Sequence, residues 1–75
     1  MEENMTFGEA LESMKEGRKV ARTGWNGRGQ FAAMQVPDAH SKMAEPYCYL
    51  CNVQGKLIPW VPSQGDLFAD DWQLA

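Results

Sequence analysis

The stretch Tyr47-Cys48-Tyr49-Leu50-Cys51-Asn52-Val53-Gln54-Gly55-Lys56-Leu57-Ile58-Pro59-Trp60-Val61 decides the fold, because it has the pattern of a β-hairpin. Residues 47–53 alternate, with every second side chain on one face (Tyr47, Tyr49, Cys51 and Val53), and this alternation predicts a strand. Gln54-Gly55 then predicts a tight turn into a second strand at residues 56–61. Pro59 cannot donate to a ladder, so the second strand is expected to lie at a sheet edge or to break there. The stretch therefore predicts an antiparallel sheet.

Two segments carry the signals of helix starts. Thr6 and Glu9 have the spacing of a capping box, and Gly17 is a suitable residue to end the helix that follows. We expect this helix to have about eleven residues. Ser63-Gln64-Gly65-Asp66 resembles a second capping sequence, before a single helical turn at residues 67–69. The apolar residues of the first helix recur at i, i+3, i+4 and i+7 and form one stripe: Phe7, Ala10, Leu11 and Met14.

Short strands are also predicted at residues 19–22, 31–36 and 71–74. Residues 37–46 have no usable periodicity, and both a functional loop and a mobile connector remain open there. Strands linked by hairpins imply an antiparallel sheet with the helix packed on one face. The predicted fold class is α+β, with an N-terminal helix packed on a small antiparallel sheet of about four strands and a short helical turn before the last strand.

The length and composition indicate one small globular domain. The chain has 75 residues, and we expect a single domain at residues 5–75 after a disordered lead at residues 1–4. A domain of this size is marginal alone, so self-association is expected to supply part of its core. The net charge of −3 argues against a nucleic-acid partner, which normally selects a basic surface. No signal peptide or membrane-spanning run is recognised, so we expect a cytoplasmic protein without a membrane partner.

Cys48 and Cys51 have the Cys-x-x-Cys spacing of redox and zinc motifs, but their context argues against both functions. A zinc site needs a second pair of ligands, and His40 is the only histidine of the chain. A redox pair normally opens a helix, whereas these cysteines lie in a predicted strand, where residues three apart face opposite sides. We therefore predict no metal site and no cofactor.

The loop Ala21-Arg22-Thr23-Gly24-Trp25-Asn26-Gly27-Arg28-Gly29 combines the groups that bind a nucleotide-like anion. Its glycines allow close approach of the backbone, and Trp25 offers a flat face for stacking. Arg22 and Arg28 flank this ring and could reach a phosphate. The alternative is a glycine-rich hairpin loop in which Trp25 is simply a core or interface anchor, and the composition of the loop leaves both interpretations open.

Catalytic groups are scarce, so an enzyme is not predicted. His40 lies in a segment without a recognisable partner for nucleophilic catalysis. Asp66, Asp70 and Asp71 form an acidic cluster that could act in a nucleotide-degrading enzyme, although helix caps and solvated carboxylates are commoner roles. No phosphate-binding P-loop is present, and the glycines at 24–29 lack the strand-to-long-helix context of a dinucleotide-binding fold. No catalytic residue is assigned.

Four segments together resemble one known family. They are Met5–Leu11, Lys19–Gly27, Pro59–Gln64 and Asp66–Trp72, and they include an Ala-Arg-x-Gly-Trp-Asn-Gly loop and an ending of the form Pro-Trp-x-x-Ser-Gln-x-Asp followed by Asp-Trp. These segments are similar to those of the second Thoeris anti-defence family, which are small phage and prophage proteins. The resemblance covers nearly the whole chain from Met5.

The resemblance implies a cytoplasmic sponge that is not an enzyme. Members of that family assemble as homotetramers, expected here as a dimer of dimers, and sequester cyclic ADP-ribose-type signals made by a TIR-domain defence protein. Alternatives are a sponge for cyclic oligonucleotides and a non-catalytic protein-interaction module. Gly65 is a departure, because relatives often have threonine there, and this departure bears on ligand choice. With Arg22 added from the loop, the expected ligand-binding residues are Phe7, Arg22, Trp25, Asn26, Arg28, Ser63, Gln64 and Asp66.

Overall fold

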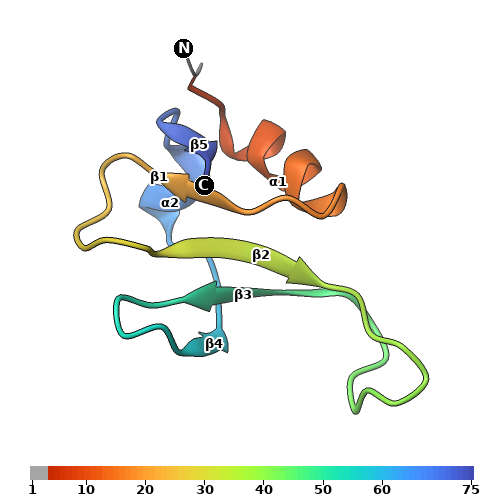
Figure 1. Cartoon of the computed structure of the whole chain (residues 1–75). Helices are drawn as coiled ribbons and strands as arrows, with labels where there is room; N and C mark the ends of the chain where they lie inside the picture. Colours follow the sequence, from red (N-terminus) through yellow and green to blue (C-terminus); the bar gives the residue numbers. More distant parts are fainter. Residues whose placement is uncertain (1–3) are drawn as a thin grey trace.

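A five-stranded antiparallel sheet organises the chain in the computed structural model, which describes residues 4–75 (Figure 1). The order of the strands across the sheet is β4-β3-β2-β1-β5, so the C-terminal strand lies beside the first strand. The α+β prediction is confirmed, and the sheet has five strands where about four were expected. The elements in chain order are α1 (Phe7–Lys15), β1 (Val20–Arg22), β2 (Phe31–Gln35), β3 (Tyr47–Cys51), β4 (Leu57–Pro59), α2 (Gln64–Phe68) and β5 (Trp72–Leu74).

The predicted hairpin is formed by β3 and β4, with shorter strands than expected. Cys51 pairs with Leu57, and β4 lies at the edge of the sheet with Pro59 as its last residue, as predicted. The strand β3 ends at Cys51 because the side chain of Asn52 accepts hydrogen bonds from backbone amides of the turn. Its Oδ1 accepts from the amides of Gln54 and Lys56, both at 3.0 Å. Gly55 closes the turn at a φ of 78°, a conformation suited to glycine.

The helix α1 has both of its predicted terminal signals. The amide of Thr6 donates to Oε1 of Glu9 at 2.9 Å, and the amide of Glu9 donates back to Oγ1 of Thr6 at 3.3 Å, which completes the capping box. Gly17 follows the helix at a φ of 90°, and its amide donates to the carbonyl of Met14. The helix covers nine residues rather than about eleven.

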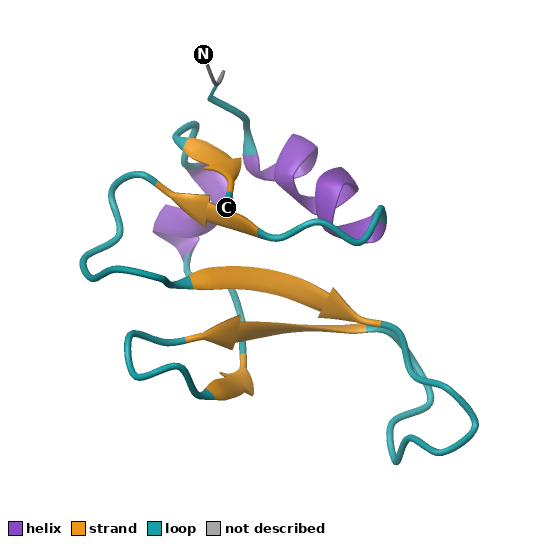
Figure 2. Ribbon diagram, viewed as in Figure 1, coloured by secondary structure: helices purple, strands orange, loops and turns teal. Residues whose placement is uncertain are grey.

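The core is small and lies between α1 and one half of the sheet. The helix contacts β5, β1, β2 and α2, and Figure 2 shows both helices gathered beside the strands β1 and β5. Trp72 is the largest fully buried side chain. On the other half of the sheet, β4 leaves apolar side chains exposed, with Leu57 63% exposed. The buried cluster consists of Ala10, Met14, Val20, Ala32 and Trp72.

The two ends of β2 lead into the two long loops of the chain. Residues 23–30 precede β2, and residues 37–46 follow it and extend away from the helices (Figure 1). The second loop contains a local turn, in which the amide of Ser41 donates to the carbonyl of Asp38 at 3.1 Å. Of the expected N-terminal lead, residues 1–3 lie outside the described residues, and Asn4 accepts a hydrogen bond from the side chain of Gln73 at 2.8 Å.

Candidate functional site

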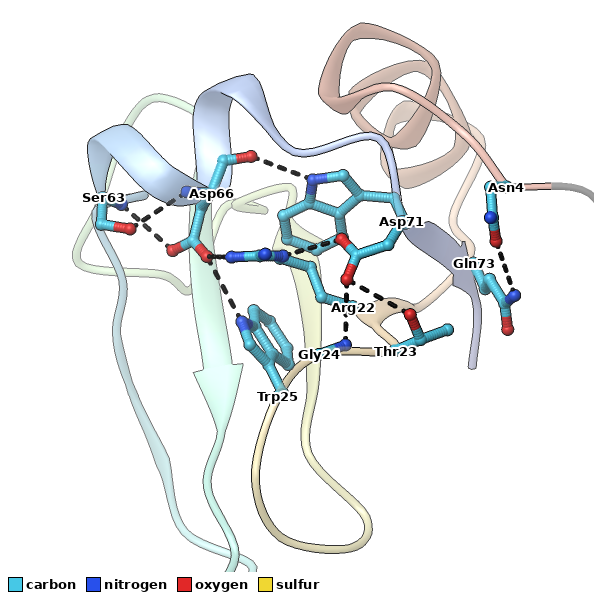
Figure 3. Close-up of polar contacts among 10 residues, drawn as sticks. Asn4, Arg22, Thr23, Gly24, Trp25, Ser63, Asp66, Asp71 and Gln73 are labelled. Atoms are coloured by element: carbon cyan, nitrogen blue, oxygen red, sulfur yellow. Dashed lines mark hydrogen bonds and ion pairs between the residues drawn. The ribbon is translucent and has the colours of Figure 1, made fainter.

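An arginine between two aspartates joins the loop after β1 to the C-terminal part of the chain. Nε of Arg22 donates to Oδ1 of Asp71 at 2.8 Å, and Nη1 of Arg22 donates to Oδ1 of Asp66 at 2.9 Å (Figure 3). The pairing of β1 with β5 sets Arg22 opposite Trp72, and this register brings the guanidinium beside Asp71. The arginine therefore bridges two carboxylates from a distant part of the sequence.

Arg22 and each of the two carboxylates favour each other's ionised forms. The hydrogen bond from Arg22 lowers the pKa of Asp71, and the amide of Gly24 lowers it further. Burial alone would raise the pKa of Asp66, but hydrogen bonds from Arg22, Ser63 and Trp25 outweigh burial and leave the pKa lowered. The hydrogen bonds to Asp71 and Asp66 raise the pKa of Arg22. Both carboxylates are therefore ionised at neutral pH.

Trp25 is held by the same network. Its indole Nε1 donates to Oδ1 of Asp66 at 3.3 Å, the oxygen that also receives Arg22. The ring is half-buried and meets Trp72 edge-on at a centroid distance of 5.3 Å and Trp60 at 6.2 Å. Trp25 therefore packs on the aromatic core, as the anchor interpretation predicts, and still keeps an exposed part.

Asp66 also completes the capping box at the start of the helix α2. The amide of Ser63 donates to Oδ2 of Asp66, and the amide of Asp66 donates to Oγ of Ser63, both at 3.1 Å. The predicted capping sequence is thereby confirmed, with Ser63 as the N-cap. The carbonyl of Asp66 accepts from the indole of Trp72 at 3.0 Å. One buried residue thus connects the helix, the loop and the core.

The tip of the loop is exposed and shaped by glycines. Gly27 and Gly29 have φ values of 96° and 76°, and the exposed side chain of Arg28 lies between them. No carboxylate in the described part of the chain forms an ion pair with Arg28. A Cβ on Gly27 would overlap with the side chain of Val53, so the tip packs closely against the β3–β4 turn. The tip therefore presents a cation that no described carboxylate pairs with, on a closely packed backbone.

The structure brings most of the predicted site residues into one neighbourhood. Phe7 joins the aromatic group through Trp72, at a centroid distance of 5.5 Å. Gln64 is the exposed first residue of α2, and Asn26 is exposed at the loop tip. The residues that connect the neighbourhood and were not predicted in it are Asp71, Trp60 and Trp72.

Two hollows in the surface lie away from this neighbourhood. One, of about 250 Å³, is lined by Tyr47, Tyr49, Met43 and strand β4. The other, of about 410 Å³, is an open depression beside Arg18 and Lys19. Neither of these two hollows includes a residue of the loop or of α2.

The described residues hold no group of three or more His, Cys, Asp or Glu side chains placed to bind a metal ion. Both cysteines are free thiols on β3; burial raises the pKa of Cys48, and Cys51 is buried. None of the described helices is long and apolar enough to cross a membrane.

The fold and the site define a small α+β domain that displays an arginine-bearing glycine loop beside an aromatic core. The profile of the Tad2-like family, described as the Thoeris anti-defense 2-like domain, matches residues 5–75. A protein of Bacillus phage SP01 named Thoeris anti-defense 2 is 36% identical to this chain over an alignment of 87 positions. The alignment covers 99% of this chain and 98% of that protein. The chain belongs to the Thoeris anti-defense 2 family, and the resemblance found in its sequence is confirmed.

Proposed function

We propose that the protein is an anti-defence sponge in the host cytoplasm that binds and sequesters a cyclic nucleotide immune signal without degrading it. The signal class is a cyclic ADP-ribose isomer made by a TIR-domain protein. The observation that carries this proposal is the half-buried Trp25, fixed by Asp66 at the base of a loop whose Arg28 is exposed and unpaired within the described chain. Membership of the Thoeris anti-defense 2 family supports an anti-defence role for such a site.

The base, the pyrophosphate and the ribose hydroxyls of a cyclic ADP-ribose isomer can each be matched with a group on this surface. The free side of Trp25 can stack on a base, an interaction worth about 1–3 kcal/mol. Arg28 can pair with the pyrophosphate, for which charged hydrogen bonds contribute roughly 1.5–3 kcal/mol. The hydroxyl of Ser63 accepts from Asp66, so its proton remains available to a ligand oxygen. Gln64 and Asn26 are exposed amides that can bind ribose hydroxyls.

Three further residues belong to the proposed site through the ring that they support. Asp66 is paired with Arg22 and accepts from the indole of Trp25, and Phe7 packs against Trp72, the ring that Trp25 meets edge-on. Gly65 lies between the two cap residues of α2, so a side chain at this position would project from the same helix start. The absence of a hydroxyl there is expected to affect which isomer is preferred.

Binding without turnover fits the state of the carboxylates. An effective general acid or base needs a pKa near the working pH. Asp66 and Asp71 instead have lowered pKa values and are paired with Arg22. Asp70 is exposed, and His40 lies in the loop at the other end of β2. We therefore propose neither a catalytic residue nor a cofactor.

We also propose that the protein assembles as a homotetramer, a dimer of dimers. Its accessible surface is 5478 Å² for 8.4 kDa, whereas a compact monomer of this mass exposes about 4600 Å². The excess of roughly 900 Å² is about what one partner buries in a standard interface. Val61 and Phe68 are 87% and 83% exposed; Val61 precedes the N-cap of α2, and Phe68 is the last residue of that helix. A second subunit on these side chains would border the ligand site.

Calorimetry with a panel of cyclic ADP-ribose isomers tests the proposal, followed by heat release and mass spectrometry of the ligand. We expect tight binding of at least one isomer and its recovery intact. Arg28→Ala should weaken binding at least tenfold, whereas Arg18→Ala, at an exposed arginine after α1, should change it less than twofold. Cleaved ligand would indicate an enzyme, and binding of cyclic oligonucleotides alone would indicate the other signal class.

The main competing function is a protein-interaction module, which the exposed Phe68 and Val61 favour. Trp25→Ala separates the two functions. A sponge loses its ligand while its assembly stays intact, whereas an interaction module changes its assembly and binds no isomer in the wild-type form. Sedimentation velocity beside the calorimetry measures both properties on the same sample.

A further inference from the structure

We propose that Asp71 is the positioning residue of the ligand site: it fixes the loop backbone and Arg22, and through Arg22 and Asp66 it sets the orientation of Trp25. Asp71 itself does not contact the ligand in this proposal. The inference rests on the proposed function and adds to it the residue that prepares the binding surface before the ligand arrives.

The contacts of Asp71 gather three consecutive residues of the loop. Its Oδ1 accepts from Nε of Arg22 at 2.8 Å, and its Oδ2 accepts from the amide of Gly24 at 2.9 Å and from Oγ1 of Thr23 at 3.2 Å. The carbonyl of Asp71 accepts from the amide of Thr23 at 3.1 Å. These contacts hold the side chain and the backbone of the loop start in one arrangement (Figure 3).

The planar guanidinium of Arg22 connects Asp71 to Asp66, which orients Trp25. A guanidinium has its donors in a rigid fork, so fixing Nε also fixes where Nη1 points. Nη1 of Arg22 meets Oδ1 of Asp66 at 2.9 Å, and the same oxygen receives the indole Nε1 of Trp25 at 3.3 Å. Without Asp71 the fork keeps only one of its two carboxylates and can turn about its side chain. Oδ1 of Asp66, which orients Trp25, then no longer has a fixed donor in Arg22.

The loop needs this fixing because its own contacts are few. Within the loop, the amide of Trp25 donates to the carbonyl of Arg22 at 3.2 Å, and the side chain of Gln30 donates to the carbonyl of Asn26. Glycine-rich segments lose much conformational entropy when they are ordered. If such a segment is already ordered in the free protein, the free energy of ligand binding is not reduced by the entropic cost of ordering it. Asp71 therefore raises affinity by supplying the order in advance.

A purely structural role for Asp71 makes different predictions, and Asp71→Asn distinguishes the two. A structural role would weaken the fold throughout, as we expect of Thr6→Ala, which removes the N-cap of α1 and its hydrogen bonds with Glu9. We expect Asp71→Asn to speed exchange of the Gly24 amide at least tenfold and to shift the Trp25 indole Nε1 resonance in the ligand-free protein. The Ser41 amide, which donates to the Asp38 carbonyl in the loop at the other end of β2, is the internal reference and should stay in place.

The ligand arm uses whichever cyclic ADP-ribose isomer the wild type binds. We expect at least tenfold weaker binding and faster dissociation for Asp71→Asn, but less than a twofold change for Thr6→Ala. Asp71→Glu keeps the charge beside Arg22 and moves the carboxylate by one methylene. This variant should remain folded and still lose the Gly24 contact and affinity, so it replaces Asp71→Asn if that variant does not fold.

The outcomes separate the two proposals. Wild-type affinity in both Asp71 variants, or an unchanged Gly24 amide and Trp25 indole, would overturn the positioning role. An equal loss of affinity in Thr6→Ala would also overturn it, because the loss would then follow global stability. If no isomer binds the wild type, the proposed function fails, while the ligand-free measurements still decide whether Asp71 orders the loop.

Discussion

The indoles of Trp25 and Trp72 meet edge to face, with ring centroids 5.3 Å apart and an interplanar angle of 79°. Both rings also donate to Asp66, Trp25 to its carboxylate and Trp72 to its carbonyl. Trp72 is fully buried and Trp25 is half-buried, so the ring proposed to meet the ligand rests directly on the core. Changes in the core and changes at the ligand site are therefore expected to be coupled.

Trp72→Phe tests this coupling. The smaller ring leaves space in the core and leaves the carbonyl of Asp66 without its donor, and an unpaired buried group costs about 1–3 kcal/mol. We expect a loss of this size in the free energy of unfolding, measured by circular dichroism in urea, and weaker ligand binding. Trp60→Phe is the comparison, because Trp60 is half-buried. Equal stability of the wild type and Trp72→Phe would contradict the central role of this ring.

The loop tip can be tested at two glycines that share a positive φ, a conformation that would strain any other residue. Gly27→Ala and Gly29→Ala each place a Cβ at a positive φ, which costs roughly 1–2 kcal/mol. Only at Gly27 does the Cβ also overlap with Val53, whereas Gly29 has open space around it. We expect Gly27→Ala to be the more destabilising in thermal unfolding. When Val53→Ala is added, the unfolding temperature of Gly27→Ala should rise to that of Gly29→Ala. Equal unfolding temperatures of the two single variants would exclude the contact between position 27 and Val53.

Acid is expected to release the loop. Asp66 and Asp71 have pKa values below their ordinary values in the folded chain, so their contribution to stability is complete above the unfolded pKa of about 4. That contribution is lost as the pH falls through the folded values. The Trp25 indole resonance should therefore change on titration from pH 6 to pH 2. In Asp71→Asn the change should be smaller, and a transition centred above pH 5 would point to another group.

The exposed side chains beside α2 are expected to take part in assembly. Phe68→Ser removes a ring that is 83% exposed, so the free energy of unfolding of the single chain should change by no more than about 0.5 kcal/mol. We expect a smaller assembly in sedimentation velocity at micromolar concentration. Val36→Ser, at an exposed residue beyond β2, serves as the control and should sediment like the wild type. An unchanged assembly in Phe68→Ser would place the interface elsewhere.

The features that the sequence predicts well depend on near neighbours. The cap of α1 at Thr6, the cap of α2 at Ser63 and the edge position of Pro59 each follow from the chemistry of a few adjacent residues. The strand ends were less predictable, because Asn52 competes with the ladder through its side chain and ends β3 early. Local spacing thus identifies the elements better than their limits.

The centre of the candidate site depends on a pairing that local patterns do not reveal. Arg22 and Asp71 are 49 residues apart, and they meet only because β5 pairs with β1. An arginine in a short strand and an aspartate before a tryptophan are each common in exposed positions. The sequence therefore identified Trp25 and Asp66 as candidates, but it grouped Asp71 with possible catalytic carboxylates instead of with the support of the loop.

The pairing of β2 with β3 has a practical consequence for labelling the protein. Five residue pairs from Phe31–Cys51 to Gln35–Tyr47 fix this register, and the 37–46 loop begins beyond its far end. Lengthening a flexible loop costs only about 0.6 kcal/mol for each doubling of its length. A fluorescent tag or affinity peptide inserted near His40 would thus lie at the end of β2 opposite to Trp25, and the protein could be labelled without altering the surface that is proposed to bind the ligand.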